Sequence, residues 1–230
     1  CMRKETDINK MKSIMKSLLY TDIENTEYSP LIVQHPIFSS GFLSCNERQY
    51  DFTNYVDFLD ACDIYAKHID NFSSLEECFM LLRSPYYMTF LKFAKPYLSH
   101  ADFSKFLGTA WTEEECVNTD INVPLNIAAR WFRSADKTIL MQDSEYNTYC
   151  NLSNSLTVYR GVTTDHNPNG MSWTRDKPKA EWFANRFGKG YVLEGVVEKE
   201  NVLAFFNRRN EEELVIPAKY VRNQLKHIYE

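Results

Sequence analysis

The stretch LTVYRG at residues 156–161 marks the point at which the pattern of apolar residues in this chain changes. It is rich in β-branched and aromatic residues and closes on a glycine, which is typical of a strand that runs into a turn. Residues 165–170, DHNPNG, are dense in turn-forming types, and residues 171–174 have strand character again. We therefore expect a strand, a loop and a second short strand at the start of a β-rich C-terminal part.

The residues that follow predict further strands around one short helix. Pro178 is well placed to begin this helix, and Gly188 and Gly190 to end it. Its apolar stripe is predicted to consist of Ala180, Phe183, Ala184 and Phe187. More strands are expected over residues 191–197, 202–206, 213–216 and 220–227.

The chain from residue 8 to about residue 135 has a helical period instead. One helix is expected where apolar residues recur at helical spacing, at Met11, Ile14, Met15, Leu18 and Leu19. The same spacing predicts a longer helix over residues 52–69. Ser74 and Thr112 each open a capping-box pattern, and Pro124 suits the first position of another helix.

Together these patterns predict an α+β protein in which a helical N-terminal half precedes a small mixed or antiparallel two-sheet core. We expect a helical domain or extension over residues 1–107 and a second domain over residues 108–230. No internal repeat or low-complexity linker separates the two.

Charge is distributed unevenly along the chain. Residues 1–149 carry 14 basic and 21 acidic side chains, a net charge of −7, whereas residues 150–230 carry 12 basic and 10 acidic ones, a net charge of +2. The basic excess suits an anionic ligand such as a dinucleotide. It is too small by itself to indicate a groove for nucleic acid.

The six cysteines include no CxxC pair and form no metal-ligand pattern with the five histidines. We therefore expect free thiols in a reducing compartment, and no metal. The N-terminal residues show no apolar stretch with a small-residue cleavage site, and no segment has the apolar length of a membrane span. A cytoplasmic location without membrane contact is the expectation.

Four polar residues of the β-rich part carry the chemistry. Arg160, at the end of a strand, offers a fork of N–H donors that matches phosphate oxygens. Ser172 offers a small hydroxyl that can fix the rotamer of a glutamate. Glu211 and Glu213 are two residues apart, so on a strand they share one face while Glu212 faces away. Paired carboxylates can divide the work, one stabilising a developing positive charge and one taking a proton from a nucleophile.

In this order and context, YRG at residues 159–161, SWT at 172–174 and EEELVIP at 211–217 resemble the arginine–serine–glutamate class of mono-ADP-ribosyltransferases. That class includes binary clostridial toxins and vertebrate arginine transferases, and the resemblance covers roughly residues 110–230. It implies a catalytic domain over residues 108–230 that cleaves NAD as a co-substrate and transfers ADP-ribose to a macromolecule, in a toxin or effector role.

The resemblance also implies roles for the motif residues. Glu213 is expected to be the catalytic glutamate at the nicotinamide ribose, with Ser172 fixing its orientation. Glu211 is expected to position or deprotonate the acceptor.

Besides Ser172 and Glu213, four residues are implied as contacts of NAD. Arg160 and Arg186 are expected at the phosphates, Gly161 at the nicotinamide amide and Phe183 stacked on the nicotinamide ring. The resemblance places acceptor recognition in a loop made of Asn207, Arg208, Arg209 and Asn210.

The chain departs from the family in two ways. Only 12 residues separate Arg160 from Ser172 and 53 separate Arg160 from Glu213, so the loops that cover NAD in the large toxins are shorter. Trp173 also replaces the usual small central residue.

Several questions stay open at this level. A Glu at position 211 favours an arginine on a protein as the acceptor, while Arg208, Arg209 and the basic C-terminal third keep nucleic acid as an alternative. A catalytically silent interaction module on the same fold is a further alternative. The acidic helical half is a candidate for binding a target, a neutralising partner or a delivery component.

Overall fold

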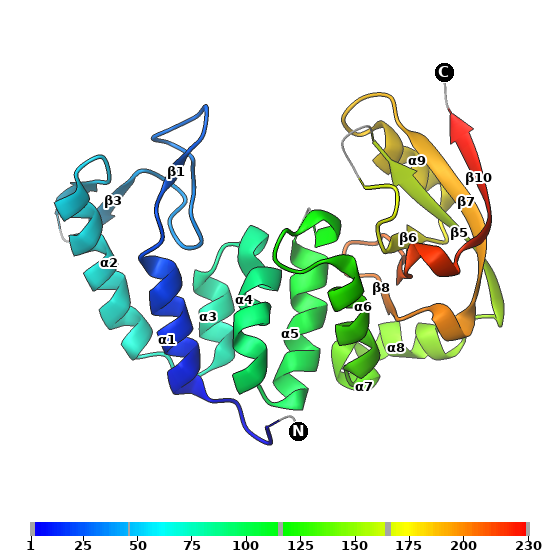
Figure 1. The fold of residues 1–230 in the computed structure, drawn as a ribbon, viewed down its shortest axis with the longest axis horizontal. Coiled ribbons are helices and arrows are strands. Elements are labelled where there is room, and N and C mark those ends of the chain that lie inside the picture. Colours follow the sequence, from blue (N-terminus) through cyan, green and yellow to red (C-terminus); the bar gives the residue numbers. More distant parts are fainter. Residues whose placement is uncertain (1–2, 46, 115–116, 164–166, 229–230) are drawn as a thin grey trace. The chain divides into compact units, whose positions relative to one another are not determined.

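The computed structural model describes residues 3–45, 47–114, 117–163 and 167–228 (Figure 1). The chain forms two compact units, Cys1–Asp102 and Phe103–Glu230. The boundary lies five residues before the expected one and falls within a single helix, α5 (His100–Glu113). No composition shift marks it, because the helical period continues through it.

The first unit is mainly helical. Its α-helices are α1 (Ile8–Leu19), α2 (Tyr55–Asp70), α3 (Leu75–Leu81) and α4 (Tyr87–Ala94), with the 3₁₀ turns η1 (Ser84–Tyr86) and η2 (Lys95–Tyr97) on either side of α4. The expected stripe of α1 is confirmed, since Met11, Met15 and Leu19 are fully buried. The capping box at Ser74 is also confirmed.

Two expectations for this unit are wrong. The helix expected from residue 52 begins at Tyr55, because the Asn54 side chain accepts the Val56 amide and caps it; Tyr55 and Val56 are exposed rather than buried. The segment between α1 and α2 is not helical but holds two small antiparallel pairs. These are β1 (Glu24–Asn25) with β2 (Val33–Gln34), and β3 (Phe42–Cys45) with β4 (Arg48–Asp51).

The second unit starts with helices. After α5 come η3 (Val117–Thr119), α6 (Leu125–Ser134), α7 (Lys137–Leu140) and α8 (Asp143–Cys150). The expected helix start at Thr112 is wrong, because Thr112 lies in the last turn of α5. Its hydroxyl donates to the Gly108 carbonyl at 2.9 Å instead of capping a following turn. Glu115, the last residue of that expected box, lies outside the described residues. Pro124 occupies the N-cap position of α6 and is not its first helical residue, which is Leu125.

The strands expected after residue 155 are confirmed, with small shifts at their ends. They are β5 (Ser155–Val162), β6 (Ser172–Thr174), β7 (Tyr191–Glu198), β8 (Ala204–Phe206), β9 (Glu213–Val215) and β10 (Arg222–Ile228). The 3₁₀ turns η4 (Lys199–Asn201) and η5 (Ala218–Tyr220) lie in the connections. The α+β class is therefore confirmed. The expected turn at residues 165–170 lies partly outside the described residues, but the Gly170 amide donates to the Asn167 carbonyl at 3.1 Å.

In the described part of the chain these strands form one six-stranded antiparallel sheet in the order β10-β7-β5-β6-β9-β8 (Figure 1). Its middle is narrow: β5 and β6 share a single residue pair, Tyr159 with Thr174. On either side the pairs are longer, eight residues between β5 and β7 and three between β6 and β9. The sheet is thus two three-stranded halves that meet at one residue pair. The expected two-sheet core is wrong, because the pairing of Tyr159 with Thr174 joins all six strands into one sheet.

Helix α9 (Lys177–Asn185) packs against β5 and β7. Its Ala180 and Ala184 are fully buried, as expected from the stripe. Phe187 is not: it lies beyond the end of the helix and is 67% exposed. The helix ends before Gly188, whose φ of +126° an L side chain rarely adopts.

Gly161 brings α9 close to β5. A methyl group at this position would lie 2.2 Å from the Ala180 carbonyl oxygen and 2.6 Å from the Ala184 nitrogen. Both are backbone atoms, so α9 must move away from the sheet to accommodate a side chain. We expect Gly161→Ala to lower the free energy of unfolding of the second unit by about 1–3 kcal/mol.

Urea unfolding followed by tryptophan fluorescence measures this change, because all four tryptophans lie in the second unit. Thr157→Ala, at an exposed position of the same strand, is the control and is expected to cost less than about 1 kcal/mol. Equal midpoints for the two variants would contradict the close packing at Gly161.

Candidate functional site

A cavity of about 140 Å³ lies in the second unit. Its walls come from α5, η3, β5, β6, α9 and the turn before β9. The structure brings eight of the sequence-predicted site residues to this cavity: Arg160, Gly161, Ser172, Phe183, Arg186, Arg209, Glu211 and Glu213.

Glu213 is the most buried carboxylate of the predicted set. It is the first residue of β9, opposite Thr174 of β6 and Phe206 of β8, and it is 9% exposed. Its Oε1 accepts a hydrogen bond from the Trp111 indole at 2.9 Å. Burial raises the pKa of Glu213, and hydrogen bonds from Ser172 and Trp111 work in the opposite direction by stabilising the charged form.

Ser172 is held from the other side by Asn118 of η3. The Asn118 Nδ2 donates to the Ser172 Oγ at 2.9 Å, and the Met171 amide donates to the Asn118 Oδ1 at 2.6 Å. One amide side chain therefore links η3 to the backbone just before β6 and to the hydroxyl of Ser172.

Arg160 is buried on β5. Its Nη1 donates to the Ser172 carbonyl at 2.7 Å and its Nη2 to the Asn167 carbonyl at 2.8 Å. Burial lowers the pKa of Arg160 to about 10, and the nearby Glu213 charge opposes that shift. At neutral pH the guanidinium is therefore still charged, and it ties the sheet halves together where their backbones share one residue pair.

Glu211 and Glu213 were expected to share one face of a strand, and this expectation is wrong. β9 begins only at Glu213, and Glu212 has a φ of +47°, so Glu211 belongs to a turn and not to the strand. The turn still brings Glu211 to the cavity, where its Oε1 lies 3.3 Å from the Arg209 Nε. Glu212 pairs instead with Arg175 at 3.1 Å, outside the residues that line the cavity.

The aromatic wall comes from α9 and the residues after it. Phe183 is half-buried and lines the cavity together with Phe187. Arg186 lies between two aromatic rings, with its guanidinium 5.3 Å from the Trp182 ring and 4.8 Å from the Phe187 ring. Phe187 is exposed, so this part of the wall is in contact with solvent; Trp182 is exposed as well but does not line the cavity.

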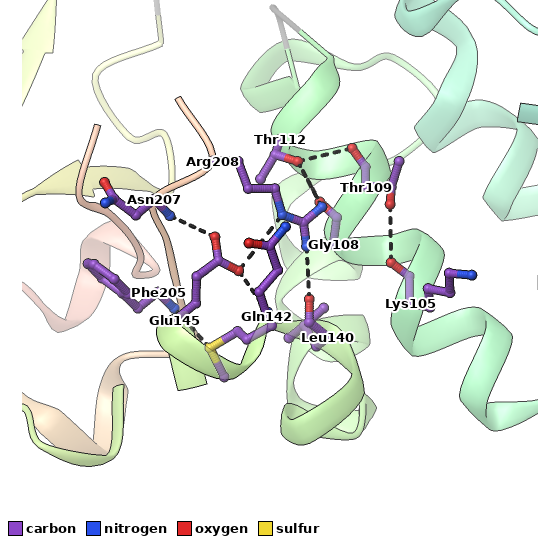
Figure 2. A network of polar contacts seen from close by, with 11 residues as sticks. Lys105, Gly108, Thr109, Thr112, Leu140, Gln142, Glu145, Phe205, Asn207 and Arg208 are labelled. Atoms are coloured by element: carbon purple, nitrogen blue, oxygen red, sulfur yellow. Dashed lines mark hydrogen bonds and ion pairs between the residues drawn. The ribbon is translucent and has the colours of Figure 1, made fainter. Parts of the chain in front are cut away.

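The predicted recognition loop at residues 207–210 divides into two parts. Arg209 lines the cavity and Asn210 is exposed, with a φ of +56°. Arg208 turns the other way, into the helices (Figure 2). Its guanidinium donates to the Thr112 hydroxyl and the Leu140 carbonyl, both at 3.3 Å.

Glu145 of α8 completes this buried network (Figure 2). It is 3% exposed; its Oε1 accepts the Asn207 amide at 2.8 Å, and its Oε2 lies 3.8 Å from the Arg208 Nε. The Asn207 side chain in turn accepts the Glu212 amide at 3.1 Å. The network therefore fixes the course of the turn that carries Glu211.

Trp111, Glu114 and Asn118 are among the cavity-lining residues that were not predicted as site residues. In the sequence, Trp111 has the pattern of an aromatic residue that packs in a helical core, and Glu114 was expected to belong to a capping box. Asn118 lies in a segment without any periodic pattern. Nothing local in the sequence distinguishes Trp111 and Asn118, because they acquire their roles by contact with residues 102 and 54 positions away.

Within the described ranges, no group of three or more His, Cys, Asp or Glu side chains is arranged to hold a metal ion. No helix among the same residues has the length and apolar character needed to cross a lipid bilayer.

Comparison with known proteins gives no family. No protein-family model matches the chain, and neither the curated proteins nor the solved structures include a significant match.

The two neighbouring arginines of the turn are expected to differ in their effect on stability. Arg208→Met leaves the buried Glu145 without its cationic partner, so we expect it to lower the free energy of unfolding by about 1–3 kcal/mol. Arg209→Met removes a partly exposed ion pair, and a change within about 0.5 kcal/mol is expected. Urea unfolding of the two variants checks this, and equal losses would contradict a structural role specific to Arg208.

Proposed function

We propose that this chain is an NAD-dependent mono-ADP-ribosyltransferase with its site in the cavity of the second unit. The observation that carries the proposal is the Glu213 carboxylate, buried at the cavity wall and held by hydrogen bonds from Trp111 and Ser172. A carboxylate in such surroundings stabilises a positive charge that develops beside it more strongly than one in water does.

The reaction that needs such a group is cleavage of the bond between nicotinamide and ribose. The C–N bond breaks, nicotinamide leaves with the bonding electron pair, and the ribose passes through an oxocarbenium-like state with positive charge near its anomeric carbon. Glu213 stabilises that state more than the ground state, which is the requirement for catalysis. The acceptor then forms the new bond to the anomeric carbon and loses its proton.

Glu211 is the group that we assign to the acceptor. It lies on the same cavity as Glu213 and is held by Arg209 in a partly exposed position. A carboxylate there can accept the proton that an incoming nucleophile loses. The two glutamates thus have different surroundings, as the two roles require.

Charge and hydrogen-bonding capacity around the cavity suit an NAD molecule. Arg160, Arg186 and Arg209 line it, which favours the pyrophosphate. Among the described residues, the buried Arg160 Nε and Trp173 Nε1 have no hydrogen-bond partner, although both residues line the cavity. Phe183 supplies a ring face for nicotinamide.

We favour an arginine on a protein as the acceptor, since Glu211 is a partly exposed carboxylate of the cavity that can act as a base. One observation keeps nucleic acid as a second candidate. The exposed rings of Trp182 and Phe187, with Arg186 between them, are of the kind on which nucleobases stack.

Incubation of the full chain with labelled NAD and a cell lysate tests the proposal. We expect Glu213→Gln to lower both NAD cleavage and labelling at least about 100-fold, because it removes the charge that stabilises the transition state. Glu211→Gln is expected to lose labelling of the acceptor while keeping most NAD hydrolysis by water. Glu212→Gln, whose side chain pairs with Arg175 away from the cavity, is the matched control.

Parallel digestion identifies the acceptor. Label that protease releases supports a protein acceptor, and label that nuclease releases supports nucleic acid. Absence of NAD cleavage by the wild-type chain, or equal cleavage by Glu213→Gln, would overturn the proposal in favour of a catalytically silent module.

A further inference from the structure

We infer that Trp111 and Asn118, which lie outside the three sequence motifs, are positioning residues that hold the Glu213 carboxylate in one orientation and in its charged form. The expected effects on catalysis rest on the proposed function, whereas the hydrogen bonds made by Trp111 and Asn118 do not depend on it.

Trp111 is a donor with little freedom to move. It lies on α5, is 1% exposed, and its ring packs edge-on against Phe132 of α6, with ring centres 5.0 Å apart and an interplanar angle of 89°. An indole has one N–H, and here it donates to the Glu213 Oε1 at 2.9 Å. The packing of two helices therefore fixes the direction from which one carboxylate oxygen is held.

Asn118 acts on Glu213 through Ser172. The Met171 amide occupies the Asn118 Oδ1, so the amide nitrogen of Asn118 is the group that faces the Ser172 Oγ. That nitrogen can only donate, which makes the Ser172 oxygen an acceptor at this contact. The hydroxyl proton of Ser172 is then left to donate to Glu213. Asn118 thereby determines that Ser172 is the donor in its contact with Glu213.

The charges around Glu213 show why two donors are needed. Arg160 from β5 and Arg209 from the turn favour its charged form, whereas Glu211 and burial disfavour it. Glu114, just after α5, and Arg186, just after α9, line the same cavity. Because burial is the largest effect and raises the pKa of Glu213, loss of either donor raises that pKa further.

The direction of the pH effect follows from this. Catalysis requires the charged carboxylate, so a variant that lacks one donor loses activity most at low pH and recovers it as the pH rises. A variant that is only less well folded loses activity by a similar factor at every pH. The pH profile therefore separates positioning from a general structural role.

The indole signals of the four tryptophans give a readout that does not depend on activity. In ¹⁵N-labelled full-length protein, Trp111→Phe identifies the Trp111 signal by its loss. We expect this N–H resonance to lie downfield and to shift as Glu213 titrates, and the shift to disappear in Glu213→Gln. A Trp111 signal that behaves the same in wild type and in Glu213→Gln would overturn the assignment of Trp111.

NAD cleavage as a function of pH completes the test for Trp111. Trp111→Phe keeps an aromatic ring but removes the N–H, and we expect a roughly tenfold lower rate near neutral pH with the profile moved to higher pH. Trp131→Phe, in α6 and packed on Phe103, is the matched control with an unchanged profile. A pH-independent loss in Trp111→Phe would overturn the positioning role.

Asn118→Asp tests the relay through Ser172. It keeps an oxygen for the Met171 amide but replaces the donor that faces Ser172 with an acceptor. We expect it to shift the pH profile upward in the wild-type background and to have no such effect in Ser172→Ala. An equal shift in both backgrounds would overturn the relay, since the new charge would then act directly.

The two kinds of failure can be told apart. If the wild-type chain cleaves no NAD, the proposed function fails, while the tryptophan resonance still decides whether Trp111 holds Glu213. If NAD is cleaved but neither variant moves the pH profile, the positioning roles fail and the proposed function stands.

Discussion

A carboxylate that is 9% exposed can keep its charge in a protein only if donors replace the water it has lost, and this constraint organises the second unit around Glu213. The donors come from different layers: Trp111 from α5 and Ser172 from β6. Each is held in turn by a further residue, Phe132 behind Trp111 and Asn118 behind Ser172. The helices are therefore part of the site and not merely a support for the sheet.

The second constraint is the narrow middle of the sheet. Because β5 and β6 share one residue pair, backbone hydrogen bonds alone give little resistance to separation of the two halves. Arg160 strengthens the junction from a side chain, through the carbonyls of Ser172 and Asn167. The charged group that we assign to NAD phosphates thus also keeps Ser172 near Glu213, and binding and structure depend on the same guanidinium.

The strands, and eight of the residues that line the cavity, could be predicted from the sequence because they depend on local signals. The β-branched run before Gly161, the strand-like composition of residues 191–197 and the turn residues before β6 each act within a few positions. Prediction from the sequence failed where a distant contact decides the outcome. Glu211 and Glu213 were expected to meet on one strand face, but the network of Asn207, Arg208 and Glu145 directs a turn with Glu212 at positive φ. The carboxylates reach the same cavity by a different backbone path.

By itself, the amino-acid sequence determined the α+β class and the order of the β-rich part, and it indicated Arg160, Ser172 and Glu213, which line one cavity. Periodicity and turn chemistry are local properties, so they can be read without the fold. Only the tertiary structure decided that Trp111 and Asn118 belong to the site and that Arg208 does not line the cavity. The physical reason is that a hydrogen bond depends on where two groups lie in space, and Trp111 and Glu213 are 102 residues apart in the chain.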